Sequence, residues 1–162
     1  MRLLLALAAV SVLLTCCAPG QDPSSPLVRI ASRDYGDDKN NIVVEEITRG
    51  PHTSRLKLTY DDLGSSVGSS MFIMRGVYEV SKARGFEYFI NLKEWEAEDG
   101  ARIYVIGFTN QQNADIHKEY GTEYSLTNNY GQPISHMSVS ECDLLWGNER
   151  TTSNKPDAGD GL

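Results

Sequence analysis

The stretch from residue 66 to residue 109 constrains the fold most strongly, because its apolar pattern changes once, from the period of a helix to the period of a strand. Up to Arg84, apolar residues recur at spacings of three and four, which is typical of a helix with one apolar face. The residues expected on this face are Val67, Met71, Ile73, Met74, Val77, Tyr78 and Val80. Such a face is stable only when it is covered, so the sequence predicts one long helix packed on another layer.

Both ends of this helix are marked in the sequence. Ser65 or Ser66 is expected to act as N-cap, because a serine oxygen accepts a hydrogen bond from the unpaired amides of the first turn. Gly85 follows the last helical residue, where a left-handed cap is favoured. Gly76 lies in the middle of the helix, where glycine costs about 1 kcal/mol relative to alanine. We therefore expect the helix backbone to approach a strand closely at Gly76.

After the helix the period changes to two, which predicts strands over residues 88–95 and 103–108. An Asp-Gly pair at residues 99–100 supplies the backbone angles that a hairpin turn between them needs. Earlier in the chain, residues 42–48 and 55–60 are rich in branched side chains and predict two further strands.

Together these elements predict an α+β fold over a single domain, residues 27–146. The expected architecture is an antiparallel sheet of about four to five strands with one long helix packed on one face, in the order strand-strand-helix-strand-strand. Weaker patterns predict a short strand at 27–30, a helical turn at 114–120, an edge strand at 134–140 and an apolar cluster at 142–146 that docks on the domain. Residues 147–162 are polar and predict a disordered tail.

The composition excludes several classes of protein. A chain of 162 residues with 40% hydrophobic content can form one small domain with an ordinary core. Its formal charge of -7, with lysines and arginines scattered along the chain, argues against a nucleic-acid partner, because nucleic-acid binders present a basic patch. No cofactor-binding motif is present, and we expect no cofactor.

The N-terminus carries an export signal. Met1-Arg2 gives a positive start, and the apolar run from Leu3 to Leu14 is too short to cross a bilayer but has the length of a signal-peptide core. Residues 1–16 are therefore interpreted as a signal peptide. Residues 17–26 contain prolines and small polar residues without periodicity, and they predict a flexible tether.

The end of this leader, Leu14-Thr15-Cys16-Cys17, resembles the signal of bacterial lipoproteins, in which leucine and two small residues precede the cysteine that receives lipid. The resemblance implies that Cys17 is acylated and becomes the first mature residue, with Cys16 as the alternative. Each buried methylene contributes about 0.8 kcal/mol, so several acyl chains anchor a protein stably. Neither cysteine is followed by aspartate, which in this family implies the outer membrane of a two-membrane bacterium. The expected partners are that membrane, with the domain facing the periplasm, and an envelope protein.

A second resemblance lies at the end of the helix. Residues 78–81 (YEVS) and 85–89 (GFEYF) are similar to the central signature of a group of small uncharacterised envelope lipoproteins, in which a helix ending in glycine leads into an aromatic strand. Any helix that ends in a glycine cap and runs into a strand has this form. The resemblance implies no activity and no functional residue.

One segment matches a catalytic motif. Residues 64–68 (GSSVG) fit G-x-S-x-G between a strand and a helix, the context of a nucleophile elbow. In this hypothesis Ser66 is the nucleophile, and its partners are His117 or His136 as base and Asp143 or Glu141 as orienting acid. The fold that hosts this elbow needs a parallel sheet and a longer chain, and a serine-capped loop explains the same residues. We therefore predict no enzymatic activity and no catalytic residue.

Other candidate sites are weaker. His52, His117 and His136 lie far apart in sequence without a second ligand at a chelating spacing, and the acidic turn at residues 94–99 is too short for a calcium loop, so no metal site is expected. The adjacent carboxylates at residues 45–46 and 61–62 face opposite sides of a strand and are interpreted as solvated surface.

Two further features allow two interpretations each. Cys142 is the only remaining thiol once Cys17 is acylated and Cys16 removed, and it is interpreted as a buried small hydrophobe rather than a reactive site. The segment from Tyr120 to Tyr130 interleaves tyrosine with asparagine and glycine, which suits either a carbohydrate or peptide groove or an exposed loop.

Three functions follow from these features. The favoured hypothesis is a lipid-anchored periplasmic module that binds or assembles without catalysis. The second is a periplasmic ligand-binding domain that uses residues 120–130 for a carbohydrate or peptide. The third is a small serine hydrolase centred on Ser66.

Overall fold

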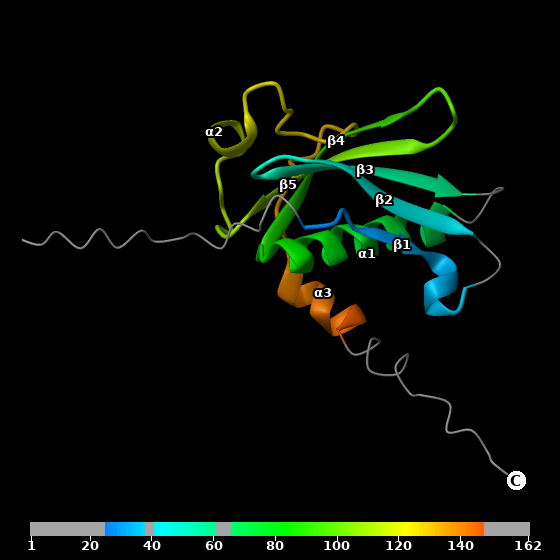
Figure 1. Ribbon diagram of the computed structural model, residues 1–162. Helices are drawn as coiled ribbons and strands as arrows, with labels where there is room; N and C mark the ends of the chain where they lie inside the picture. The colour runs from blue at the N-terminus through cyan, green and yellow to red at the C-terminus, as the bar shows by residue number, and fades with distance from the viewer. Residues whose placement is uncertain (1–24, 38–40, 61–65, 148–162) are drawn as a thin grey trace, which may run out of the picture.

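A curled antiparallel sheet of six strands forms the centre of the molecule (Figure 1). The computed structural model describes residues 25–37, 41–60 and 66–147. Its strands are β1 (Arg29–Ala31), β2 (Ile42–Arg49), β3 (Thr53–Tyr60), β4 (Tyr88–Glu96), β5 (Arg102–Thr109) and β6 (Met137–Ser138). They lie side by side in the order β1-β2-β3-β5-β4-β6, with every neighbouring pair antiparallel. The helices are the 3-10 helix η1 (Ser32–Tyr35) and the α-helices α1 (Ser66–Arg84), α2 (Ile116–Tyr120) and α3 (Val139–Trp146).

The predicted α+β class with an antiparallel sheet is confirmed, but the finer description is wrong in three respects. The sheet has six strands, α1 is accompanied by three shorter helices instead of being the one helix, and β5 lies next to β3 in the sheet. The order strand-strand-helix-strand-strand omits β1 and η1 before it and α2, β6 and α3 after it, although the weaker patterns at 27–30, 114–120, 134–140 and 142–146 overlap β1, α2, β6 and α3. The omitted elements are short, so their residues carry little periodicity; contacts with distant parts of the chain define them.

Several sequence predictions fall outside the described residues. These are the signal peptide of residues 1–16, the tether up to residue 24 with Cys16 and Cys17, the carboxylates at 61–62, and the tail after residue 147. The side chains of Ser65, Ser66 and Val67, expected as cap residues and as part of the helix face, are also not described. Among the described residues, no helix is both long and apolar enough to span a membrane.

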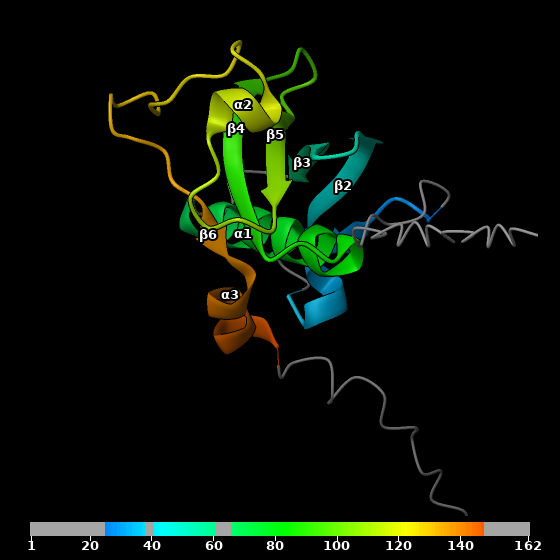
Figure 2. The ribbon, with the colours of Figure 1, turned by 90° about the vertical axis from the view of Figure 1, so that its left-hand side faces the viewer.

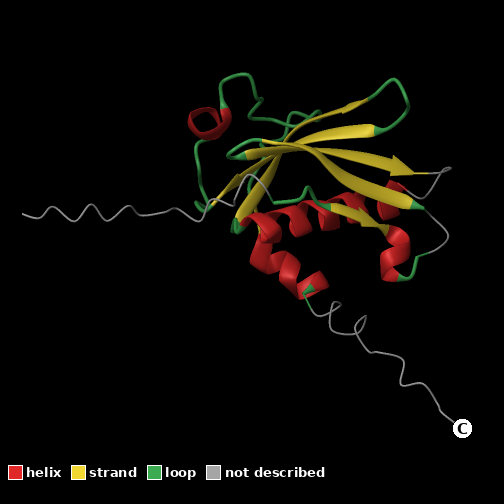
Figure 3. Cartoon of the chain, viewed as in Figure 1, coloured by secondary structure: helices red, strands yellow, loops and turns green. Residues whose placement is uncertain are grey.

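The helix α1 lies across one face of the sheet, and α3 packs against α1 on the side away from the sheet (Figure 3). The middle of its apolar face is formed by Ile73, Val77 and Val80, which are buried against β2, β3 and β4. Met71, expected on the same face, is 43% exposed. The buried stripe is thus narrower than the sequence pattern, because α3 and the sheet cover only part of the helix.

The predicted close approach at Gly76 is confirmed. A Cβ atom added at Gly76 would lie 2.5 Å from Cγ1 of Val44 on β2. The turn prediction is also confirmed: Gly100 has a φ of 78°, and its amide donates to the carbonyl oxygen of Ala97 at 3.0 Å. The Asp99 carboxylate accepts a hydrogen bond from Lys57 at 2.6 Å and so ties this turn to β3.

On the other face of the sheet, the chain after β5 covers part of β4 and β5, with α2 lying over these strands (Figure 2). Here Ile116 of α2 is buried with Ile90 and Leu92 of β4, and a second, smaller apolar core results. Gly107 of β5 makes room for this layer, because a Cβ atom there would lie 2.7 Å from the ring of Tyr120. The sheet therefore separates two cores, the larger one under α1 and the smaller one under α2.

Candidate functional site

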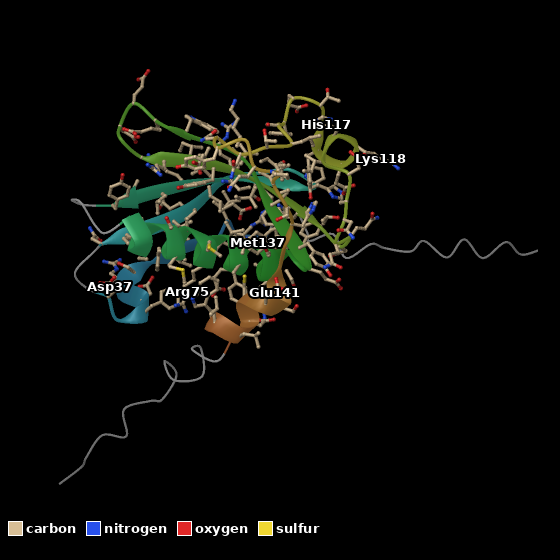
Figure 4. The ribbon with its side chains drawn as sticks, turned by 180° about the vertical axis from the view of Figure 1, so that it is seen from behind. Asp37, Arg75, His117, Lys118, Met137 and Glu141 are labelled. Carbon is tan, nitrogen blue, oxygen red and sulfur yellow. The ribbon has the colours of Figure 1, made fainter. Side chains whose placement is uncertain are left out.

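A half-open pocket of about 210 Å³ lies between α1, β4, β5 and residues 128–137, which form the covering segment. It forms where the pairing of β4 is interrupted. The strand β6 pairs only with Tyr88 and Phe89, so that, within the described part of the chain, β4 has no strand partner on this side beyond Phe89. Met137, at the start of β6, lies in front of α1 at this place in the view from behind (Figure 4).

The floor of the pocket is apolar and buried. Ile73 and Val77 reach it from α1, one turn apart, and Ile106 reaches it from β5. Phe89 of β4 completes the floor and pairs with Phe108 across the ladder. These side chains belong to the edge of the main core, so the pocket opens directly onto packed apolar surface.

The rim of the pocket is polar and exposed. Asn91 of β4 and Asn128 and Ser135 of the covering segment line it, and all three are exposed to solvent. The Oδ1 atom of Asn128 is already occupied, since it accepts hydrogen bonds from the amides of Tyr130 at 2.9 Å and Gln132 at 3.0 Å. Within the part of the chain that the structure describes, no charged side chain lines the pocket. The geometry is that of a small apolar site with uncharged hydrogen-bonding groups at its mouth.

A small hairpin-like loop shapes the covering segment. Thr127 and Pro133 form an isolated antiparallel bridge, and the amide of Asn128 donates to the carbonyl oxygen of Gln132 at 2.8 Å. Gly131 has a φ of 73°, a left-handed conformation that favours glycine at the tip of this loop. At its other end the segment continues into β6, which pairs with β4. Both ends of the covering segment are therefore fixed to the fold.

A buried polar network lies outside this pocket, between the turn after β2 and the end of α1. Glu46 is only 3% exposed, and its carboxylate accepts hydrogen bonds from Ser54 Oγ at 2.6 Å, Arg49 Nε at 2.9 Å and the amide of Val28 at 3.2 Å. Arg84 donates to Ser54 Oγ at 2.8 Å. The interpretation of Glu46 as solvated surface is therefore wrong, because α1 and the entering chain at Val28 lie on this side of β2.

The same network shifts the pKa values of Glu46, Arg49 and Arg84. Burial raises the pKa of Glu46, but hydrogen bonds from Arg49, Ser54 and Val28 outweigh burial and hold the pKa below its ordinary value. Burial lowers the pKa of Arg84. Arg84 also donates to the carbonyl oxygens of Gly50 and Pro51, each at 2.6 Å. All these groups have partners within the protein, so the network ties the β2–β3 turn to α1 and holds the fold.

The three histidines, distant in sequence, are gathered around α2. His52 Nδ1 lies 2.9 Å from Oε1 of Glu119, and His117 Nε2 lies 2.9 Å from the carbonyl oxygen of Tyr124. His136 Nε2 lies 3.4 Å from the hydroxyl of Tyr120, and burial lowers the pKa of His136. Among the described residues, no group of three or more His, Cys, Asp or Glu side chains is placed to hold a metal ion.

The structure separates two of the partners proposed for Ser66, His117 and Asp143. The chain around His117 lies on the face of the sheet opposite α1 (Figure 2). Asp143 of α3 instead accepts hydrogen bonds from the Tyr78 hydroxyl at 2.6 Å and Lys82 Nζ at 2.8 Å. Glu141 is exposed on α3. The sheet thus lies between His117 and Asp143.

The tyrosine segment does not line the pocket. Tyr120 and Tyr124 pack on the smaller core, whereas Tyr130 is 88% exposed. Asn128 is the residue of this segment that reaches the rim. Cys142 is buried, and burial raises the pKa of its thiol, in keeping with the expected small hydrophobe.

Sequence reasoning missed the pocket because its floor residues carry only the signal of a core. Ile73, Val77 and Ile106 follow the ordinary helix and strand patterns, and nothing local distinguishes them from fully covered neighbours. Comparison of the chain with protein-family models, curated proteins and solved structures finds no match.

Proposed function

We propose that this chain is a lipid-anchored periplasmic module of the bacterial envelope, held at the outer membrane, that binds its ligand or partner without catalysis. The observation that carries the binding role is the pocket with a buried apolar floor and an exposed, uncharged polar rim. Such a combination is typical of sites that bind ligands by apolar contact and orient them with a few polar groups.

The position of the pocket is compatible with anchoring at the N-terminus. The described chain enters the fold through β1, at one edge of the sheet, whereas the pocket lies at the opposite edge between β4 and β6. The described residues before β1, 25–28, are therefore at the other edge of the sheet from the pocket. Residues 17–26 would space the domain from the lipid attached to Cys17 or Cys16.

Metabolic labelling with palmitate tests the anchor. The full chain expressed in a two-membrane bacterium is expected to incorporate palmitate and to fractionate with the outer membrane. Cys17→Ser is expected to abolish incorporation if Cys17 is acylated, whereas Cys16→Ser abolishes it if the alternative holds. Label that persists when both cysteines are replaced would remove the lipid anchor from the proposal.

Photocrosslinking in cells tests the binding role. A photoreactive residue at position 137, beside the pocket, is compared with one at position 144 on α3, where Leu144 is 85% exposed. We expect an adduct at position 137 that is absent at position 144 and is lost when Met74→Trp narrows the pocket. Equal adducts at both positions, or adducts unaffected by Met74→Trp, would contradict binding at this site.

A further inference from the structure

We infer that the pocket binds a small uncharged amphiphile, with its apolar body on the floor and one amide, ester or alcohol group at the rim beside Asn91 and Ser135. This inference rests on the proposed binding function and names the chemical class of its ligand.

The volume of the pocket limits the size of the ligand. At about 210 Å³ it exceeds the apolar cavity of about 150 Å³ that holds benzene in an engineered protein. It is smaller than the roughly 300–1,000 Å³ of sites for drug-sized molecules. The apolar body is therefore about one ring or a short alkyl chain, and a whole phospholipid does not fit.

The side chains at the mouth suit an apolar body of variable shape. Met74 of α1 is half-buried, and Met137 is 38% exposed at the edge of the pocket. Both are unbranched and adapt to irregular apolar partners. A ligand on the floor would remove these exposed apolar surfaces from water, which favours binding.

The lining of the pocket favours an uncharged ligand over a charged one. None of its lining side chains is ionisable at neutral pH, so a carboxylate or ammonium group drawn toward the floor would lose hydration without gaining an ionic partner. Near the rim, the Asn91 side-chain amide donates to Oε2 of Glu94 at 3.3 Å. The negative charge of Glu94 adds a further penalty for an anionic ligand.

The rim keeps hydrogen-bonding capacity for a neutral group. Within the described ranges, the side-chain carbonyl oxygen of Asn91 and the hydroxyl of Ser135 form no hydrogen bond to the protein. One can accept from an amide or alcohol, and the other can donate to a carbonyl oxygen. The two groups come from β4 and from the covering segment, so a ligand between them would bridge both walls.

A matched series of six-carbon probes tests the inference: hexanamide, hexan-1-ol, hexanoate and hexylamine, titrated near pH 7 and followed by amide chemical shifts. The protein is the full chain with Cys16→Ser and Cys17→Ser, so that no acyl chain competes. We expect saturable shifts at Asn91 and Ser135 with hexanamide and hexan-1-ol, and binding of the two charged probes weaker by about tenfold or more. Hexanoate binding as tightly as hexanamide, or no saturable binding of any probe, would overturn the inference.

Two substitutions of the same kind on α1 provide the control. Met74→Trp is expected to abolish probe binding, whereas Met71→Trp, three residues earlier and outside the pocket, leaves it unchanged. Asn91→Leu, at an exposed position, is expected to weaken hexanamide binding about tenfold with the fold intact. Probe binding that survives both Met74→Trp and Asn91→Leu would contradict the assignment.

Failure of the ligand class and failure of the function are distinguishable. If no probe binds while crosslinking at position 137 still depends on the pocket, the neutral-amphiphile inference is wrong and the binding function stands. If both are absent, the proposed function itself is wrong.

Discussion

Glu46 shows how much a single side chain depends on its surroundings. Its neighbour Glu45 lies on the other side of β2 and forms an exposed ion pair with Arg29 at 2.8 Å. The alternation of a strand predicts that the two carboxylates face opposite sides, and the structure agrees. Which of them is buried depends on the side of the sheet on which α1 lies, where Glu46 contacts Ser54 and the entering chain at Val28, and where Arg84 of α1 binds Ser54.

Replacing Glu46 is expected to destabilise the fold. Glu46→Gln removes the carboxylate that balances Arg49 and leaves the buried cation uncompensated, so we expect a loss of about 3 kcal/mol in the free energy of unfolding. The matched control Glu45→Gln removes an exposed ion pair and should change it by less than about 1 kcal/mol. Urea denaturation measures both, and equal effects of the two substitutions would contradict the role of burial.

The same carboxylate is expected to make stability depend on pH. Because the pKa of Glu46 in the folded state lies below its ordinary value of 4.5, the unfolded chain binds a proton at higher pH than the folded one. Glu46 therefore contributes stability above pH 4.5, and this contribution is lost as the pH falls through the folded-state pKa. Urea denaturation at several pH values should show that the free energy of unfolding falls less steeply below pH 4.5 in Glu46→Gln than in the wild-type chain. The same pH dependence in both proteins would refute this.

At the scale of elements, the long helix and strands are predicted by local sequence pattern, whereas the short ones are defined by tertiary packing. The periodicity of residues 66–84 and the Gly85 cap predict α1, and alternation predicts β2, β3, β4 and β5, because these patterns repeat over several residues. Three-residue β1 and two-residue β6 carry only the weak patterns noted at 27–30 and 134–140, and their bounds are set by pairing with β2 and β4. The expectation of a single helix was wrong because η1, α2 and α3 are also too short to show a clear helical period in the sequence.

The packing of α1 on β2 can be tested at Gly76. Gly76→Ala improves helix propensity by about 1 kcal/mol, but its Cβ atom would meet the stiff, branched side chain of Val44. We expect a net destabilisation of about 1–3 kcal/mol, measured by thermal or urea unfolding.

The control is the same substitution in a Val44→Ala background. In that background the Cγ methyl groups of Val44 that the new Cβ atom would meet are absent. Gly76→Ala should therefore lower the free energy of unfolding by less than in the wild-type chain. Strictly additive effects of the two substitutions would show that the clash is not the cause.

At the scale of the whole molecule, the sheet divides the domain into two apolar layers of unequal size. The layer under α1 contains most of the buried side chains, and α3 extends it, with the rings of Tyr78 and Trp146 5.6 Å apart. The layer under α2 depends on a few residues, with Tyr120 packed over Gly107. The pocket lies at the edge where both layers meet the covering segment.

The smaller layer is expected to loosen without unfolding the larger one. Tyr120→Ala removes the ring over Gly107 and should speed hydrogen exchange of amides in α2 and the covering segment, with a loss of about 2 kcal/mol in local stability. Amides of α1 should keep their protection. Tyr130→Ala, at an exposed position, is the control and should change neither. Equal acceleration in α1 would mean that the two layers unfold together.

The sequence by itself determined the fold class, the positions of the main helix and four strands and the turn at Gly100, because each is recorded in residues close together in the chain. It also marked Gly76 as a point of close approach, because a mid-helix glycine is otherwise costly, but only the structure identified Val44 as the side chain it meets. Only the tertiary structure decided the burial of Glu46, the gathering of the histidines and the pocket. The pocket joins residues as far apart in the chain as Ile73 and Ile134. No local pattern records such contacts, because they arise from the way the sheet brings its edge, α1 and the covering segment together.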